Sequence, residues 1–456
     1  MNIEEIVNKQ REFFSTHKTL NIEYRKEKLN LLKQNIKKYK KDICNGLYLD
    51  LNKPEIESIM CEISICIDEI DYFLKNLKRL SKPKKVKGTI ANFPSKSYSY
   101  KEPYGVTLIM SPWNYPFLLS IQPLIESISA GNTAILKVGN ASKNTSNSIK
   151  KIIQETFNEE YVYFLDGDRS VNQDLLKQKF DYVFFTGSKE VGKIVLKSQS
   201  EFLTPVTLEL GGKSPTIIDK TADLSIASKR ICFGKILNCG QTCVSPDYVL
   251  IDKSIKEYFY NFLAKEINTQ LGENPIENKD YGKIINKKHF DRLINLLENQ
   301  KIILGGKCDE TTLKIEPTII EIDNIDNILM KEEIFGPILP VIVYENEQEI
   351  FDIINYNPSP LALYYFGKDK KLSNKIIKEI SFGGGCINDT IMHLTSNMSF
   401  GGVGQSGMGS YHKEKGFETF SHTKNILVKK GSFDLNFRYR PYTDKKIEKL
   451  KILLDD

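Results

Sequence analysis

Hydrophobic residues recur at intervals of three and four along roughly the first 80 residues of the chain. The stretches 2–17, 24–43 and 54–80 carry this spacing, which predicts amphipathic helices packed on a larger body. "SKPKKVKG" then breaks the pattern, and "TIANFPSKSYSYKEPYGV" alternates polar and apolar positions. Alternation of this kind predicts an extended arm, near residues 83–103, that leaves the domain as a hairpin.

From residue 105 the pattern changes to short apolar runs separated by helical spacing. The strand-like runs are "GVTLIM", "TAILKV", "YVYFL", "DYVFFTG" and "PVTLELGG". Helix-like segments at 117–131 and 142–157 lie between the early runs. This alternation is typical of βαβ units, so we expect an α/β fold with a parallel sheet. A second α/β stretch follows from 215 to about 395, opened by a helix for which Asp223 is the N-cap and Gly240 the stop.

Composition and charge narrow the classes of function. The chain has 456 residues, 40% of them hydrophobic and 27% charged, which is typical of a soluble globular protein of two or three domains. Its 64 Lys and Arg and 58 Asp and Glu leave a net charge of only +6, and the lysines are scattered. This distribution argues against a nucleic-acid-binding surface. Without an apolar signal segment or a run of the ~20 apolar residues that a membrane span needs, we expect a cytoplasmic protein with no membrane anchor. The tail "KKIEKLKILLDD" predicts a short amphipathic helix.

Two cysteines, Cys239 and Cys243, lie four positions apart in "ILNCGQTCVSP". A zinc site would need further Cys or His ligands close by, and a disulfide does not suit a reducing compartment, so we expect neither. Packing and nucleophilic chemistry remain. The residue type alone favours packing, because free Cys is often buried. The place of Cys243 in a loop just after a helix favours a side chain that faces a cleft.

Three further stretches carry candidate chemistry, each beside a structural alternative. In "FTGSKEVGK", Gly187 and Gly192 flank a turn that leads into a helix. Such a turn can bind a phosphate, or it can be only a tight structural turn. Glu209 ends a strand in "TLELGGKSP" and is either a functional acid or a solvated one. In "MSPWNYPF" two prolines fix the loop of Asn114, whose amide can donate to an oxyanion or only join a strand to a helix.

Two later loops complete the set of motifs. "KEEIFGPILPV" places Glu332, Glu333 and Phe335 before a Gly-Pro turn, and "SFGGVGQSGMGSYH" is glycine-rich. The order and spacing of "PWNYP", "LKV", "FTGS", "LELGGKSP", "GQTC", "EEIFGP" and "FGGVGQSGMG" resemble the NAD(P)-dependent aldehyde dehydrogenase superfamily over about residues 1–445. The start of the chain and the tail after "SYHKEKGF" resemble its class 3-like branch, which acts on fatty and aromatic aldehydes.

The resemblance implies roles for the catalytic candidates. Cys243 matches the nucleophile, which leaves packing for Cys239 and keeps a redox role open. The Asn114 amide and the Cys243 backbone N–H would hold the oxyanion of a thiohemiacetal. Glu209 would be the base that activates water against the thioester left by hydride loss.

The same resemblance implies a site for NAD or NADP. Lys137 and Glu333 match positions that hold the ribose hydroxyls, and Phe335 matches one beside the nicotinamide. The residues expected near the phosphates are Gly187, Ser188 and Gly192.

One position in the cofactor motif departs from the family pattern. In "LKVGNAS", Asn140 stands where relatives commonly carry an acid. An acid near the adenosine ribose repels the 2′-phosphate of NADP, whereas an amide carries no charge, and Lys137 and Lys143 add positive potential. Alternatively, Asn140 caps the helix that starts near Ser142. We expect dual use, with NADP at least comparable to NAD.

Domains and substrate follow from the same resemblance. It implies a Rossmann-type cofactor-binding domain at 1–208 with the oligomerisation arm at 83–103, a catalytic domain at 209–395, a C-terminal oligomerisation segment at 396–456, and a homodimer. Tyr115, Leu237 and Ile391 suggest an apolar funnel for an apolar aldehyde.

Two rival functions remain beside aldehyde oxidation to the acid. One is a coenzyme A-acylating aldehyde dehydrogenase, against which Glu209 argues, because a base that speeds hydrolysis would waste the acyl-enzyme. The other is a non-catalytic structural or binding protein with the same fold. The joint presence of Cys243, Glu209, Asn114, Lys137 and Glu333 argues against it.

Overall fold

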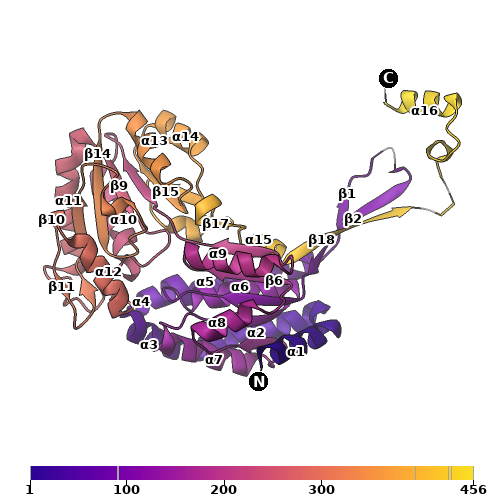
Figure 1. Ribbon diagram of the computed structural model, residues 1–456, viewed down its shortest axis with the longest axis horizontal. Coiled ribbons are helices and arrows are strands. Elements are labelled where there is room, and N and C mark those ends of the chain that lie inside the picture. The colour runs from indigo at the N-terminus through magenta and orange to yellow at the C-terminus, as the bar shows by residue number, and fades with distance from the viewer. Residues whose placement is uncertain (1, 90–91, 396, 430, 433, 455–456) are drawn as a thin grey trace. The chain divides into compact units, whose positions relative to one another are not determined.

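The computed structural model describes residues 2–89, 92–395, 397–429, 431–432 and 434–454 (Figure 1). Its internal contacts divide the chain into two units. The first joins Met1–Leu80 to Pro103–His422, and the second joins Ser81–Glu102 to Thr423–Asp456. The first unit has the α/β fold that the sequence predicts.

Five helices precede the first unit's sheets. They are α1 (Ile3–Ser15), α2 (Ile22–Lys38), α3 (Lys40–Leu51), α4 (Glu55–Ser58) and α5 (Ser64–Leu80), with a π-helical turn at Ile59–Ile63 between the last two. The helix predicted at 24–43 is two helices, because the backbone of Tyr39 leaves the helical region at φ −96° and ψ 14°. The periodicity of apolar residues continues through this break, so the sequence pattern does not indicate it.

The first sheet has the strand order β17-β7-β6-β3-β4-β5. Its strands are β3 (Val106–Met110), β4 (Thr133–Lys137), β5 (Val162–Phe164), β6 (Tyr182–Thr186), β7 (Val206–Glu209) and β17 (Gly407–Met408). All pairs are parallel except β17 with β7. The chain reverses its direction of progress between β3 and β6, which is the topological switch point where such sheets bind ligands.

Helices cover both faces of this sheet because its strands alternate apolar side chains between two clusters. Ile109 and Phe184 pack into the cluster of α2, α3, α5, α6 (Leu118–Ala130) and α7 (Lys143–Thr156). Leu108 and Val183 pack into the cluster of α1, α8 (Arg169–Leu176) and α9 (Lys189–Ser200). The predicted strands and both predicted helices of this region are therefore confirmed.

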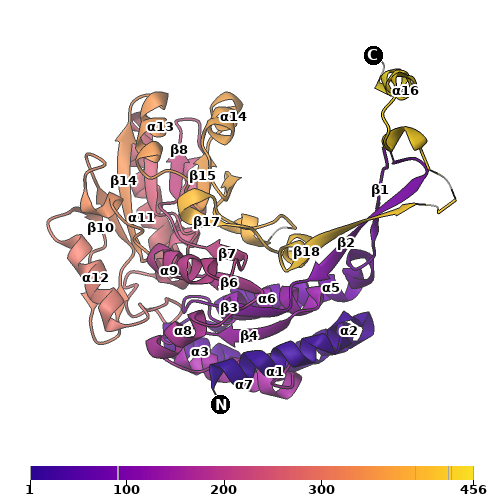
Figure 2. The ribbon, with the colours of Figure 1, turned by 45° about the vertical axis from the view of Figure 1, so that its right-hand side comes forward.

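The second sheet has the order β10-β13-β14-β9-β8-β15-β16 and is parallel except at β10 (Figure 2). Its strands are β8 (Pro215–Ile218), β9 (Tyr248–Asp252), β10 (Lys301–Leu304), β13 (Thr318–Glu321), β14 (Ile338–Tyr344), β15 (Ala362–Phe366) and β16 (Gly384–Ile387). A small hairpin, β11 (Cys308–Asp309) with β12 (Lys314–Ile315), lies apart from it. Among the described residues of the first unit, the α-helices after β8 are α10 (Leu224–Ile236), α11 (Lys256–Leu271), α12 (Lys287–Leu297), α13 (Glu347–Tyr356), α14 (Lys370–Glu379) and α15 (Lys413–Thr419).

The predicted start of α10 is confirmed, but its end differs. The Asp223 carboxylate accepts from the Ile226 N–H at 3.1 Å and so caps the helix. The helix ends at Ile236, and a 3₁₀ turn at Leu237–Gly240 follows before the loop of Cys243.

The second unit is a three-stranded sheet with a terminal helix. Strand β1 (Lys84–Val86) pairs antiparallel with β2 (Ser95–Pro103), and β18 (Ser421–Lys429) lies on the other edge of β2. The extended hairpin that the sequence predicts is present, and the tail forms α16 (Asp444–Leu454). The role of the arm in oligomerisation and the three domain boundaries stay predictions. Among the described residues, no helix has the length and apolarity to cross a membrane.

Candidate active site

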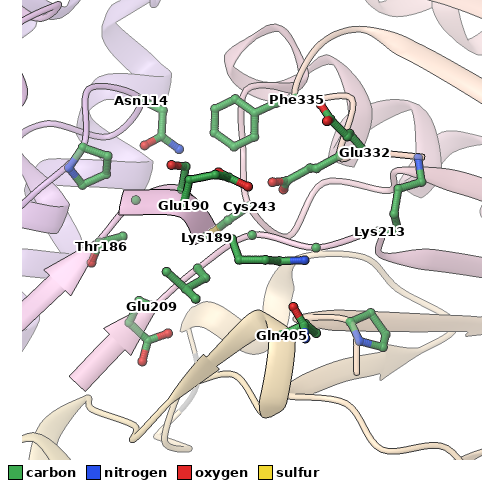
Figure 3. Close-up of a pocket in the computed structure, with 18 of the residues that line it drawn as sticks. Asn114, Thr186, Lys189, Glu190, Glu209, Lys213, Cys243, Glu332, Phe335 and Gln405 are labelled. Carbon is green, nitrogen blue, oxygen red and sulfur yellow. The ribbon is translucent and has the colours of Figure 1, made fainter. Parts of the chain in front are cut away.

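A cavity of about 560 Å³ opens at the carboxyl ends of β3, β6 and β7 (Figure 3). These ends flank the switch point of the first sheet, where an α/β fold is expected to bind its ligand. Loops from the second sheet close the other side. The lining residues are Pro112–Asn114, Leu119, Thr186–Glu190, Glu209–Lys213, Cys243, His289, Arg292, Lys331–Glu333, Phe335, 357–360 and Gln405.

A left-handed turn brings Cys243 to the cavity wall. Asn238, Cys239 and Gly240 follow one another at φ 50°, 55° and 71°. A Cβ on Gly240 would lie 2.3 Å from the carbonyl oxygen of Gly336, so both the backbone conformation and the close approach require glycine here. Non-glycine residues in this region cost about 1–3 kcal/mol each, and such turns cluster at functional sites.

The two cysteines of this turn face different surroundings. Cys239 is fully buried in the core, and its thiol donates to the Tyr281 hydroxyl at 3.4 Å. Cys243 is partly exposed and lines the cavity. Burial raises the pKa of the Cys243 thiol above its usual range, and the carboxyls of Glu333 and Glu209 raise it further. The thiol is therefore protonated near neutral pH and needs a proton acceptor before it can attack.

Asn114 is held rigidly beside this turn. Its side chain is almost fully buried, and Nδ2 donates to the Gln241 carbonyl at 3.0 Å. The backbone carbonyl of Asn114 accepts from Asn238 Nδ2 at 2.8 Å and from Lys53 Nζ at 3.2 Å. One of the two amide hydrogens goes to Gln241, so the other can serve an oxyanion.

Sequence reasoning missed Lys53, Asn238 and Gln241. Gln241 ties the turn to a distant segment, since its amide donates to Lys283 O at 2.9 Å and accepts from Ile285 N at 3.0 Å. Its position inside "GQTC" is the only sequence signal for it. No local pattern marks Lys53.

Glu209 ends β7 with its carboxyl buried in the cavity wall. It is 2% exposed, and within the described residues neither carboxyl oxygen has a hydrogen-bond partner. Burial raises its pKa well above the usual range. Figure 3 shows Asn114 and Glu209 on opposite sides of Cys243. A buried acid without a partner is costly to keep and is typical of a proton-transfer group.

Glu333 and Phe335 line the other side of the cavity. The Gly212 backbone N–H donates to the Glu333 carboxyl. Burial and the charge of Asp247 raise the pKa of this carboxyl to about 8, although Gly212, Lys213 and Arg292 act in the opposite direction. Phe335 has φ 51° and packs edge-on against Trp113, with ring centroids 5.5 Å apart. Glu332, the preceding acid, is exposed at the rim.

The start of α9 supplies the phosphate-binding candidates. Gly187 and Ser188 line the cavity, and Ser188 Oγ caps the helix by accepting from Val191 N at 3.4 Å. Gly192 is not among the lining residues. A Cβ on Gly192 would lie 2.8 Å from Leu210 Cδ2, so this glycine allows α9 to pack closely against Leu210, the residue that follows β7. Close packing is one of the glycine roles in dinucleotide-binding turns.

Lys137 and Asn140 form a pair that is not among the cavity-lining residues. Lys137 Nζ donates to Val138 O and to Asn140 Oδ1, both at 2.8 Å, and burial lowers the pKa of the amine. The alternative that Asn140 caps α7 does not match the contacts. The Asp50 carboxylate accepts from the Asn144 and Thr145 N–H groups at 3.2 and 2.8 Å, so a residue distant in sequence caps the helix.

The apolar candidates Tyr115, Leu237 and Ile391 are not among the residues that line the cavity, and the apolar funnel stays a prediction. Leu237 and Ile391 belong to the core cluster against which Cys243 packs. The Tyr115 hydroxyl pairs with Thr242 Oγ1 at 2.8 Å, one residue before Cys243.

The cavity fits a dinucleotide. Gly187 and Ser188 at the start of the 12-residue helix α9 line the same cavity as Glu333, a carboxyl that can accept from hydroxyls. A five-strand parallel order with its switch point at this cavity is the doubly wound arrangement of dinucleotide-binding enzymes. Fold and site together define an α/β enzyme of the dinucleotide-dependent class.

The comparisons with known proteins specify this class. Residues 1–426 match the model of the aldehyde dehydrogenase family. The chain is 46% identical to 4,4'-diaponeurosporen-aldehyde dehydrogenase of Staphylococcus aureus, with 95% of each chain covered. It is 40% identical to the dimeric NADP-preferring aldehyde dehydrogenase of Canis lupus familiaris, with 96% and 98% covered. The structure of the substrate-bound state of Staphylococcus aureus AldH superposes with a TM-score of 0.97 at 45% identity and covers 100% of both chains.

The chain belongs to the aldehyde dehydrogenase family. It is an NAD(P)-dependent aldehyde dehydrogenase, and its relatives, several of which are named family 3 members, match the class 3-like branch that the motifs indicate.

Proposed function

We propose that this enzyme oxidises an apolar aldehyde to its carboxylic acid through a covalent intermediate on Cys243. Addition of the thiolate to the carbonyl carbon would form a thiohemiacetal. Loss of hydride from that adduct would leave a thioester. NAD or NADP, when bound, supplies the hydride acceptor.

The Asn114 amide and the Cys243 backbone N–H would stabilise the oxyanion of the adduct. Loss of one such donor typically costs about 10²–10³ in rate. The Gln241 carbonyl, which takes one amide hydrogen at 3.0 Å, fixes the direction of the other. This arrangement supports the assignment because the donor is oriented before the substrate binds.

Glu209, once ionised, would take the proton from the Cys243 thiol and release it to solvent after hydride loss. It would then take a proton from the water that attacks the thioester, and this attack would expel the Cys243 thiolate and leave the acid. The raised pKa of Glu209 supports this role, since a carboxyl of higher pKa is a stronger base once it is ionised. The observation that carries the proposal is that a thiol, a tethered amide and a buried acid without a partner line one cavity.

The dinucleotide would be held by the start of α9 at Gly187 and Ser188, by Glu333 and by Phe335. The pair of Lys137 and Asn140 would reach the ribose after exchanging their mutual hydrogen bond for ones to the ligand. Use of NADP beside NAD is part of the proposal, and the canine relative is named NADP-preferring. A homodimer and a cytoplasmic location are proposed as well, the former because the same relative is named dimeric.

A single absorbance assay tests the reaction. With hexanal and NAD or NADP, we expect the reduced dinucleotide to accumulate without coenzyme A and the acid to be the product. A rate that depends on coenzyme A, with an acyl-coenzyme A product, would assign the acylating reaction instead. No reduction with any aldehyde would favour a binding protein.

A further inference from the structure

We infer that the buried ion pair of Lys53 and Glu62 positions Asn114 for oxyanion stabilisation. The inference rests on the proposed function, in which the Asn114 amide is an oxyanion donor. Neither residue touches the cavity, so both would act through the loop that carries Asn114.

Lys53 reaches the loop from the end of the N-terminal helices. Its side chain and that of Glu62 are 0% exposed, and Nζ lies 2.5 Å from Glu62 Oε1. A second ammonium hydrogen goes to the Asn114 carbonyl at 3.2 Å. The ammonium also lies 4.0 Å from the centre of the Tyr115 ring, a cation–π contact with the next residue of the loop.

Glu62 holds the other end of the same loop. Its second oxygen, Oε2, accepts from the Phe117 N–H at 2.9 Å and from the Leu118 N–H at 3.1 Å. These N–H groups open α6, whose own N-cap residue provides no side-chain cap. A carboxylate is stabilised at the positive end of a helix, so one ion pair fixes the loop on both sides of Pro116.

The local fold places the pair for this purpose. Glu62 lies in the π-helical turn Ile59–Ile63, and Lys53 stands between Asn52, at φ 51°, and Pro54. A π turn shifts the side chains that follow it relative to a continuous α-helix, and such turns recur at functional sites. The turn and the left-handed residue are the two irregularities that bracket α4.

The contacts continue from Asn114 to the nucleophile. Asn238 Nδ2 donates to the Asn114 carbonyl at 2.8 Å and to the Gln241 carbonyl at 3.1 Å. The carbonyl that Lys53 holds is therefore the one that joins the amide loop to the Cys243 turn. A shift of about 1 Å in a reacting geometry can cost about 10²-fold in rate.

Stability alone does not account for this pair. Desolvating two charges offsets most of their attraction, and an apolar pair of similar volume is often as stable. A role in geometry explains why the charges lie under the loop of Asn114.

The test begins with Lys53→Met/Glu62→Gln, which removes both charges and leaves none unpaired. We expect the pre-steady-state burst of reduced dinucleotide with hexanal to slow about 10²-fold, while the Kd for NAD or NADP stays within about twofold. Arg25→Met is the matched control, because it removes another buried cation, one that contacts the Ser129 and Leu20 carbonyls, and should leave the burst rate unchanged. Should the double variant fail to fold, Lys53→Leu/Glu62→Gln, which also leaves no buried charge unpaired, answers the same question.

The decisive step repeats the substitution in an Asn114→Ala background. If the pair acts through the amide, the second loss should shrink to less than about threefold, because no donor remains to be positioned. A full additional loss of about 10²-fold there overturns the positioning role and leaves the role of Asn114 intact. A wild-type burst in Asn114→Ala itself overturns the oxyanion assignment, and the inference with it.

Discussion

The polar groups on the two sides of the cavity differ in whether their hydrogen bonds are already made. On the side of Asn114, Glu209 and Cys243, polar groups have hydrogen-bonding capacity that is not used. Both carboxyl oxygens of Glu209 lack a hydrogen-bond partner within the described residues. On the side of Ser188 and Glu333, each polar side chain already has a partner: Ser188 Oγ accepts from Val191 N, and the Glu333 carboxyl accepts from Gly212 N. The Lys137–Asn140 pair, which does not line the cavity, is satisfied by its mutual hydrogen bond. Interactions left unmade in the resting enzyme can form in the transition state, whereas satisfied ones exchange partners when a ligand binds. We therefore expect chemistry on the first side and binding on the second.

The largest expected effect comes from removing the nucleophile. Cys243→Ala should lower turnover by at least about 10³-fold without changing dinucleotide binding, because no thiol remains to form the adduct. Steady-state rates and a fluorescence titration with the reduced dinucleotide measure the two effects. Cys239→Ala is the control and should stay within a few-fold of the native rate, since its thiol faces Tyr281 in the core. Equal losses in both variants would contradict the distinction between the two cysteines.

Glu209→Gln should separate two steps on the same side. Without its base the thioester should persist, so the steady rate should fall about 10²-fold while a burst of reduced dinucleotide remains. Stopped-flow absorbance resolves the burst. An unchanged steady rate near neutral pH would remove Glu209 from the mechanism.

Glu333→Gln should change binding more than chemistry. We expect the KM for NAD or NADP to rise by about tenfold or less, with kcat within a few-fold, because a neutral amide is a weaker acceptor for hydroxyls. Since burial and Asp247 raise the Glu333 pKa to about 8, the carboxylate forms as pH rises through that value. The native KM should therefore fall between about pH 7 and about pH 9, and the variant should lose this dependence. A kcat that falls in step with kcat/KM would place Glu333 on the chemical side instead.

The smallest effect should follow Asn140→Glu. The added carboxylate would pair with Lys137, whose amine already lies 2.8 Å from Asn140 Oδ1, and would repel a 2′-phosphate. We expect the ratio of kcat/KM for NADP over NAD to fall several-fold. A native enzyme that favours NAD by about a hundredfold or more, with no further shift in the variant, would refute the role of Asn140.

Local sequence patterns predicted the regular structure of the first sheet, whereas for residues 215–395 they predicted an α/β stretch and the start of α10. The apolar runs from Val106 to Glu209 became strands because a sheet covered on both faces buries nearly every side chain. Asp223 was identified as a cap because its interaction spans only three residues. The break at Tyr39 and the π turn at Ile59–Ile63 were missed, because apolar periodicity continues through both.

The candidate site shows the same limit. The motifs identified Asn114, Glu209, Cys243, Glu333 and Phe335, all of which line one cavity. They also pointed to Lys137, Asn140 and Gly192, which are not among the lining residues. A motif at the end of a strand predicts that its residues lie near the switch point. It does not predict whether a given side chain points into the cavity or pairs with another residue.

The sequence by itself determined the alternation of strands and helices, the family and the residue types that carry the chemistry. These depend on interactions within a few residues, or on motifs that keep their own spacing. Only the tertiary structure decided that Asp50 caps α7 and that Lys53 and Glu62 hold the loop of Asn114. Each of these contacts joins segments that are distant in the chain, and no local pattern records which distant polar group will satisfy a buried one.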